Sequence, residues 1–215
     1  DKPGAQLESD YLKGLTVSLG DPDSDNWVMN QETGIAKRTS LRKSHTLVET
    51  CAPCHSRRSS LDDDFQAGKP LLAHFRPSLL TEGVYYPDGQ IQDEVYVYGS
   101  FIQSKMYAAG VTCNNCHDPH SLEIGASGNA LCSSCHLPAR FDTRDLYFHV
   151  PGTAAAQGVS CHMPDKIYMG VDSRRDHSFR VRQPDLFLHL APPNAFRLCH
   201  TDQSDSWTTK AVSSW

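Results

Sequence analysis

The sequence predicts a mainly α-helical and irregular fold, in which short helices and loops, with one or two small β-hairpins, are organised by something other than a large side-chain core. Hydrophobic residues, tyrosine included, make up 39% of the 215 residues. Counting the 14 glycines in place of the 8 tyrosines, as the usual average does, gives about 42%, still below the typical 45–50%. Apolar periodicity is weak and 13 prolines are scattered along the chain, which indicates a loop-rich protein with a thin core.

Hairpins are predicted where short apolar runs flank turn residues. Residues 26–29 and 35–38 flank Gln-Glu-Thr-Gly, which is typical of a hairpin with a loop of about four to five residues. Proline and glycine within residues 85–91 predict a second tight reversal. Because the first 44 residues contain no cysteine, we expect an N-terminal segment with the first hairpin over 1–44 and a second unit over 45–215.

Two short helices are predicted between the cysteines. They cover residues 46–58 and 95–109, and the second ends at Gly110 as its C-cap. We expect connecting loop elsewhere.

The repeated unit of the chain is a cysteine–histidine motif, to which all eight cysteines belong. Three copies are complete: Cys51-Ala-Pro-Cys54-His55, Cys113-Asn-Asn-Cys116-His117 and Cys132-Ser-Ser-Cys135-His136. Two copies lack the first cysteine: Gly158-Val-Ser-Cys161-His162 and Phe196-Arg-Leu-Cys199-His200. Disulfides do not need the histidine, and zinc sites need pairs of Cys-x-x-Cys units, which three copies do not supply. Both alternatives are therefore less favoured than attachment of c-type haem.

The motif suits covalent haem because each residue has a task. Two thiols add across the haem vinyl groups from one helical turn, and the adjacent imidazole binds the iron on the proximal side. We therefore expect about five haem c groups per chain, three held by two thioethers and two by one. Only 14 residues separate His117 from Cys132, so neighbouring haems must share walls. The predicted fold is then short helices and loops wrapped around a chain of haems.

The two incomplete motifs leave alternatives open. A single cysteine can still form one thioether, and this is the interpretation that we favour for Cys161 and Cys199. Otherwise both are free thiols beside ordinary histidines, or the natural chain has cysteine in place of Gly158 and Phe196.

Histidine counting gives a second line of argument. Eleven histidines less the five proximal ones leave six candidates for distal ligation of five irons: His45, His74, His120, His149, His177 and His189. Two imidazoles on every iron are therefore expected, with one histidine to spare. His120 and His177 are the strongest distal candidates, whereas His189 lies on an apolar stretch and suits a core residue. Iron with two imidazole ligands has no open position, which favours electron transfer over substrate chemistry.

Arginines gather around His177 in the sequence. Haem propionates are carboxylates, which arginine pairs with bidentately, so Arg174 and Arg175 are candidate propionate partners. The alternative is a solvated basic face.

Charge and hydropathy exclude several classes of protein. The net charge is −5 and no concentrated Lys/Arg run is present, which argues against nucleic-acid binding. No stretch of about 18 apolar residues is present, so we expect no transmembrane segment. If the protein is exported, we expect that its signal peptide has been removed.

The chain resembles the C-terminal haem region of periplasmic multihaem cytochromes of the cytochrome c554/nitrite-reductase-like type, which tetratricopeptide repeats often follow. The resemblance covers most of the chain from about residue 11, and four stretches carry it: residues 51–58, 75–83, 103–113 and 168–180. The two incomplete motifs depart from the family pattern. The resemblance implies export and respiratory electron transfer, and members usually have further haem motifs upstream.

These observations predict an electron carrier in the periplasm or outside the cell, with about five closely packed bis-histidine c-type haems. Its partners are redox proteins or copies of itself. In the second case, haems of successive subunits form a filament, and the spare histidine, His45 by preference, ligates a neighbour's haem. The alternative is a multihaem reductase of nitrogen or sulfur oxyanions with one five-coordinate catalytic haem; an enzyme is less favoured because no Cys-x-x-Cys-Lys motif is present.

Overall fold

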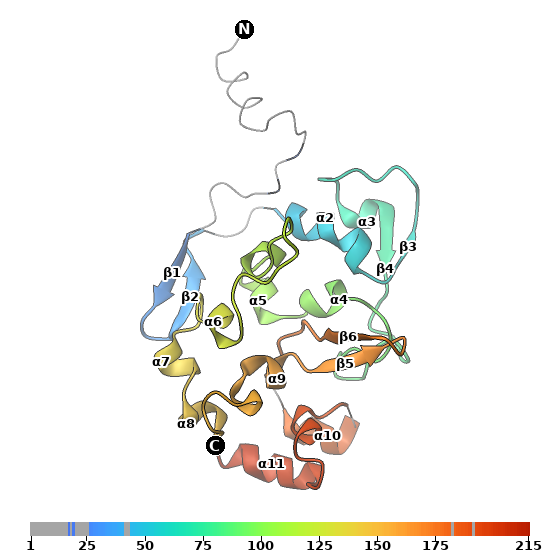
Figure 1. Ribbon diagram of the computed structural model, residues 1–215. Helices are drawn as coiled ribbons and strands as arrows, with labels where there is room; N and C mark the ends of the chain where they lie inside the picture. Colours follow the sequence, from blue (N-terminus) through green and yellow to red (C-terminus); the bar gives the residue numbers. More distant parts are fainter. Residues whose placement is uncertain (1–16, 18, 20–25, 41–43, 182, 191) are drawn as a thin grey trace.

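A computed structural model describes residues 17, 19, 26–40, 44–181, 183–190 and 192–215 (Figure 1). All eight cysteines and all eleven histidines lie within these ranges. Most of the predicted N-terminal segment, 1–44, lies outside them, so the proposed boundary between residues 44 and 45 stays a prediction.

The described residues form short helices joined by loops. The α-helices are α2 (Thr46–His55), α3 (Leu71–His74), α4 (Tyr98–Phe101), α5 (Lys105–Ala108), α6 (Asn129–Cys132), α7 (Pro138–Phe141), α8 (Arg144–Tyr147), α9 (Gly158–His162), α10 (Pro184–Leu190) and α11 (Asp205–Ser213). Three 3₁₀ turns are interspersed: η1 (Cys113–Asn115), η2 (Ala154–Ala156) and η3 (Ala195–Leu198).

The strands of the described residues form three antiparallel two-stranded sheets. They pair β1 (Trp27–Asn30) with β2 (Ile35–Arg38), β3 (Arg58–Ser60) with β4 (Phe75–Pro77), and β5 (Asp165–Tyr168) with β6 (Asp172–Arg175). The first pair confirms the hairpin expected at residues 26–38, and its loop ends at Gly34, whose φ of +69° suits glycine. The predicted reversal at 85–91 is also present, as a bridge between Tyr85 and Ile91.

Both predicted helices are shorter than expected. The first ends at His55 because Ser56 is extended, and Arg58 already pairs with Pro77 in the sheet. The second was expected to be continuous over 95–109 but is split into α4 and α5. The break falls at Ser104, which is extended and caps α5 by accepting a hydrogen bond from the Tyr107 amide. The helix also ends slightly earlier than predicted: Ala108 is its last residue and Ala109 its C-cap, and Gly110, expected as the C-cap, follows with a φ of +96°.

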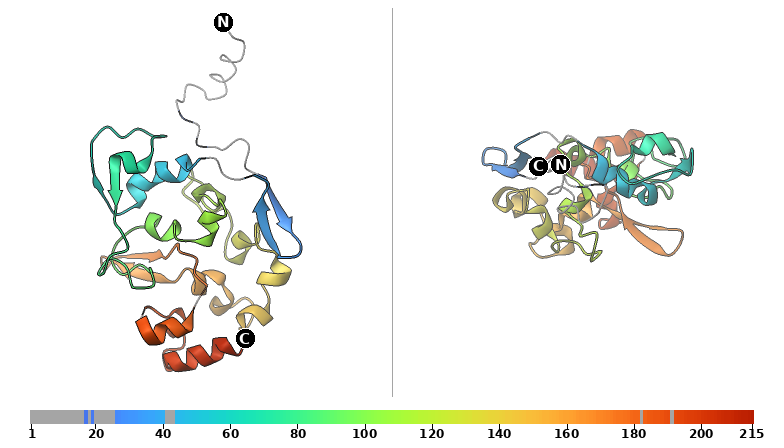
Figure 2. Two further views of the ribbon diagram at one scale, coloured as in Figure 1. Left: turned by 180° about the vertical axis from the view of Figure 1, so that it is seen from behind. Right: turned by 90° about the horizontal axis from the view of Figure 1, so that it is seen from above.

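The side-chain core is thin, as the composition predicts. One cluster joins Tyr85, Ile91, Val95 and Tyr168, and a second joins Ala52, Leu71 and Phe75. Elsewhere large apolar side chains are uncovered; Val171, on the hairpin that projects from the body in Figure 2, is 87% exposed. Short helices and loops around so little core are the fold class that the sequence predicts.

Candidate haem-attachment sites

Each Cys-His pair lies at the end of one helical turn. At the second motif the amides of Cys116 and His117 both donate to the carbonyl of Cys113, at 3.1 and 2.9 Å. The third motif repeats this arrangement with Cys132 as acceptor. In the incomplete fifth motif, Phe196 occupies the acceptor position. The first and fourth motifs lie in α2 and α9. The turn that the spacing predicts is therefore present.

Local polar residues start these turns. At the second motif, Thr112 and Asn115 form a reciprocal capping box around η1. At the fifth motif, the Asn194 side chain accepts a hydrogen bond from the Phe196 amide at 3.0 Å. Side-chain caps satisfy amides that the first turn of a helix leaves without a partner, which lets such short turns form.

The first and second motifs lie against each other. The thiols of Cys51 and Cys113 are hydrogen-bonded to each other although 61 residues separate them in the sequence. This bond lowers the pKa of Cys51 to about 7, against the opposing effect of burial, and raises that of Cys113. Two attachment turns are thereby brought together that the sequence alone leaves unrelated.

The second motif also adjoins the third. Burial raises the pKa of Cys116, and the neighbouring thiols of Cys132 and Cys135 raise it further. The thiols of the two motifs are therefore neighbours, whereas the close pair of haems expected from the 14-residue gap stays a prediction.

The third, fourth and fifth motifs follow in order. The Asn129 side chain in α6 donates to the carbonyl of Ala156 at 2.9 Å and accepts from the Gly158 amide, also at 2.9 Å, which ties the third motif to α9. The pKa of His136 is lowered by burial and then by the charge of His162. Helix α9 in turn contacts η3, the turn of the fifth motif.

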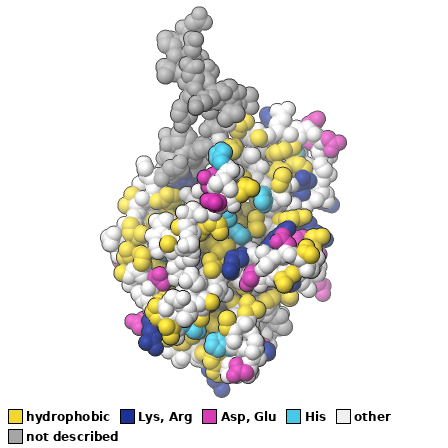
Figure 3. Space-filling view, viewed as in Figure 1, with side chains coloured by type: hydrophobic (Ala, Val, Ile, Leu, Met, Phe, Trp, Pro, Cys, Tyr) yellow, Lys and Arg dark blue, Asp and Glu magenta, His cyan; other side chains and the backbone are white. Residues whose placement is uncertain are grey.

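The five turns thus form a series through the molecule. Figure 1 shows α2, α6, α9 and the region of α10 and α11 one after another from top to bottom. In Figure 3, histidine side chains are spread along the same direction, among hydrophobic side chains.

Two pairs of imidazoles have the spacing of axial ligands. The ring centroids of His117 and His177 are 6.3 Å apart, and those of His149 and His200 are 6.0 Å apart. A metal–imidazole nitrogen bond is about 2.0 Å and the ring centroid lies about 1 Å beyond the nitrogen, so two imidazoles on opposite sides of one metal have centroids about 6 Å apart. Each pair joins a proximal histidine to one of the predicted distal histidines.

Hydrogen bonds at Nδ1 set the tautomer of several candidate ligands. His177 Nδ1 donates to the carbonyl of Arg175 at 2.9 Å, and His162 Nδ1 donates to the carbonyl of Arg180 at 2.8 Å. An Nδ1–H donor leaves Nε2 unprotonated, which is the form that binds a metal. Nδ1 is also hydrogen-bonded in three other candidates. His45 Nδ1 is bonded to the hydroxyl of Tyr107, His74 Nδ1 to the carboxylate of Asp62, and His149 Nδ1 to the carbonyl of Tyr147.

Two histidines have looser surroundings. His120 is 95% exposed, with Asp118 at 3.4 Å, and it lines an open cavity of about 410 Å³ together with Cys116 and His117. His189 is exposed on α10 rather than buried in a core. The distal ligands of His55, His136 and His162, and the suggested role of His45 toward a neighbouring subunit, stay predictions.

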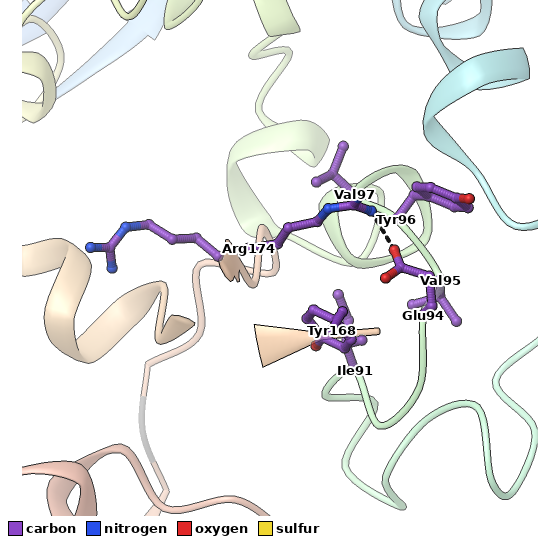
Figure 4. A pocket seen from close by; sticks show the side chains of 8 residues that line it. Ile91, Glu94, Val95, Tyr96, Val97, Tyr168 and Arg174 are labelled. Atoms are coloured by element: carbon purple, nitrogen blue, oxygen red, sulfur yellow. Dashed lines mark hydrogen bonds and ion pairs between the residues drawn. The ribbon is translucent and has the colours of Figure 1, made fainter. Parts of the chain in front are cut away.

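The arginine candidates have protein partners in the structure. Arg174 pairs with Glu94, as Figure 4 shows, and with Asp172 at 2.6 Å. Beside this pair is a cavity of about 10 Å³, about the size of one water molecule. Arg175 donates to the carbonyl of Met163 at 3.0 Å. Pairing of either arginine with a propionate stays a prediction.

The residues present fit c-type haem. The cysteines and histidines lie on single turns, two imidazole pairs have axial spacing, and apolar side chains are uncovered. No disulfide joins any of the eight cysteines, all of which are described. Within the described ranges, no group of three or more His, Cys, Asp or Glu side chains is placed to hold a metal ion, whereas a structural zinc site needs about four ligands. No helix of the described chain combines the length and hydropathy needed to cross a bilayer.

Two features of the sites were missed at the sequence level. Asn129 joins the third and fourth motifs through its two side-chain hydrogen bonds, and nothing in its local sequence marks it. At the fifth site, Trp215 contacts the rings of Phe148 and Phe196, and Trp207 contacts the ring of His200. Two of the chain's three tryptophans follow the last Cys-His pair, which is a signal that could have indicated this cluster.

Comparison with known proteins supports the fold. No family model matches the chain, and no curated protein matches it. Among solved structures, the crystal structure of the outer cell wall cytochrome OcwA is similar, with a TM-score of 0.57 and 15% sequence identity over 82% of this chain. The chain spans about half of that protein, 52%. The narrower resemblance to the cytochrome c554/nitrite-reductase-like group stays a prediction, whereas the fold of the chain is similar to that of this cytochrome.

Proposed function

We propose that the protein transfers electrons through a series of about five c-type haems, one at each Cys-His turn. The observation that carries this proposal is the order of contacts: each motif adjoins the next, from the thiols of Cys51 and Cys113 to the contact of α9 with η3. When bound, haem c supplies an iron that takes up and releases one electron. The chain's own residues hold the groups close enough for electrons to pass between them.

The imidazole pairs support closed coordination at two sites. His117 with His177, and His149 with His200, are the axial pairs that we assign. Burial lowers the pKa of His177, so its imidazole is held in the neutral form that binds iron. Two nitrogen ligands leave no position for a substrate, which favours electron transfer over catalysis.

We further propose that the protein acts in the periplasm or outside the cell, because thioether attachment of haem is typical of exported proteins and the similar structure is that of an outer cell wall cytochrome. Its partners are redox proteins, or copies of itself in a filament.

Haem stoichiometry and spin state test the proposal. A pyridine haemochrome assay with intact mass should give five haems per chain, and the ferric spectrum should be low-spin throughout. Three haems per chain would contradict attachment at Cys161 and Cys199. A stoichiometric high-spin signal would instead favour the reductase.

A further inference from the structure

The fifth site differs from the other four in what replaces the first cysteine. The fourth motif has Gly158 in that position, and a Cβ built there would meet only the Asn129 side chain, at 3.7 Å. The lost thiol therefore leaves open space at the fourth site. At the fifth site this position is occupied by Phe196. Its backbone carbonyl accepts the hydrogen bonds of the same turn, and its side chain is an aromatic ring.

The ring of Phe196 belongs to an aromatic cluster. Trp215 stacks on Phe148 with centroids 4.6 Å apart and planes at 15°, and it also contacts Phe196 at 5.8 Å. These three rings come from separate segments: the residue after α8, η3, and the chain end that follows α11. A tertiary arrangement, rather than local sequence, brings them together.

The cluster adjoins the imidazole pair of the fifth site. Phe148 directly precedes His149, whose ring is 6.0 Å from His200, and Trp207 lies 5.0 Å from His200 on the side of α11. Phe148 is nevertheless 47% exposed and Trp215 50% exposed. Large aromatic rings left half uncovered around two metal-binding groups indicate a flat apolar ligand, since burial of such rings is strongly favourable.

We propose that Phe148, Phe196 and Trp215 form an aromatic clamp that holds the fifth haem in place of the missing first thioether. This inference rests on the proposed function, since it assumes haem at Cys199. The Cys199 thiol would add across one vinyl group: its S–H bond and the π bond of the vinyl group break, one S–C and one C–H bond form, and nothing is released. The clamp fixes the other side of the macrocycle by packing, which keeps its iron between His149 and His200.

The test compares Trp215→Ala with the matched control Trp27→Ala, whose ring lies in the β1–β2 hairpin. Loss of the clamp should leave the fifth haem attached through Cys199 but mobile. One haem in five should therefore gain high-spin character. The remaining low-spin signal of that haem should be lost at a lower urea concentration than in the wild type. The control should keep the wild-type spectrum. Trp215→Ala combined with Phe196→Cys should restore the low-spin spectrum, because a second thioether does the work of the clamp.

The outcomes separate the clamp from the proposed function. Peptide mass analysis of the wild type shows whether Cys199 carries haem and whether residue 196 is phenylalanine. A haem-free Cys199 overturns both the fifth haem and the clamp. A haem-bearing Cys199 with Trp215→Ala indistinguishable from Trp27→Ala, or with no rescue by Phe196→Cys, overturns the clamp alone. Cysteine at position 196 also overturns it.

Discussion

At the scale of single residues, a histidine becomes a metal ligand when one ring nitrogen is fixed and the other is left to bind. The sequence supplied six distal candidates by counting but could not pair them with irons. In the structure, the carbonyl of Arg175 fixes Nδ1 of His177, and the ring then lies opposite His117. That carbonyl is a backbone group, so no residue type in the sequence marks it. The sequence could therefore identify His177 as a candidate ligand, but it could not predict that His177 lies beside His117.

Replacing His177 by methionine tests the first axial pair. His177→Met should change one haem from two imidazoles to His–Met ligation, and such ligation raises the reduction potential. A redox titration should therefore show one haem in about five moved to higher potential. The matched control is His189→Met, since His189 is exposed on α10 and lies near no proximal histidine among the described contacts. Identical titrations for the two variants would remove His177 from the ligand set.

At the scale of elements, the prediction succeeded where the signal is local. The β1–β2 hairpin follows from two apolar runs around turn residues. The β3–β4 pair was missed because 14 residues separate its strands, and the intervening chain includes α3. The β5–β6 hairpin was missed because its strands lack apolar alternation. Arg174 in β6 instead pairs with Glu94, far away in the sequence.

The β1–β2 hairpin also contacts the third Cys-His motif, and Gly34 is where the two meet. The Gly34 carbonyl accepts from the Leu137 amide at 2.8 Å, and the amide of Ala36 donates to the carbonyl of Cys135, also at 2.8 Å. A Cβ at Gly34 would lie 2.9 Å from Cδ of Arg140, whose guanidinium donates a hydrogen bond to the backbone carbonyl of Glu32. The glycine is therefore required by both its backbone angle and its surroundings.

Gly34→Ala should lower the free energy of unfolding through both effects. The left-handed backbone costs about 1–2 kcal/mol for alanine, and the contact with Arg140 adds about 1 kcal/mol or more. Gly152→Ala is the control, because Gly152 has a φ of +81° but no atom within 4 Å of its Cβ position. Denaturant titration should show the larger loss for Gly34→Ala. Equal losses would mean that the hairpin does not pack tightly on the third site.

Helix α9 allows a gain-of-bond experiment at the fourth site. Gly158→Cys should complete the motif, since the space for a side chain is present and the turn is already formed. The new thiol should add to the second vinyl group, so thiol titration of the denatured protein should detect no additional free thiol. Gly152→Cys, at a position with no atom within 4 Å of the added Cβ and outside the Cys-His motif, should show one. A free thiol at position 158 would argue against haem at Cys161.

At the scale of the whole molecule, the order of the five sites is the property that the sequence could least predict. The 14-residue gap indicated contact between the second and third motifs only. Contact of the first with the second depends on Cys51 and Cys113, which are far apart in the chain. Contact of the third with the fourth depends on Asn129. The thin core was predictable from composition, but the order in which the five motifs adjoin one another could be recognised only from the tertiary contacts.

Removing the middle site tests whether the molecule conducts from end to end. Electron tunnelling weakens steeply with distance, so loss of the third haem should separate the first two sites from the last two. The variant combines Cys132→Ser, Cys135→Ser and His136→Ala, and the backbone bonds to the hairpin can persist because they use main-chain groups. After partial reduction, the wild type should equilibrate in one fast phase, whereas this variant should show an added slow phase in stopped-flow spectra.

The terminal control, Cys199→Ser with His200→Ala, also loses one haem but leaves the other four in series, so it should keep the fast phase. Haem analysis must show the loss of one haem in both variants. Equally fast equilibration in the two would mean that electrons bypass the third site and that the five sites do not form a single path.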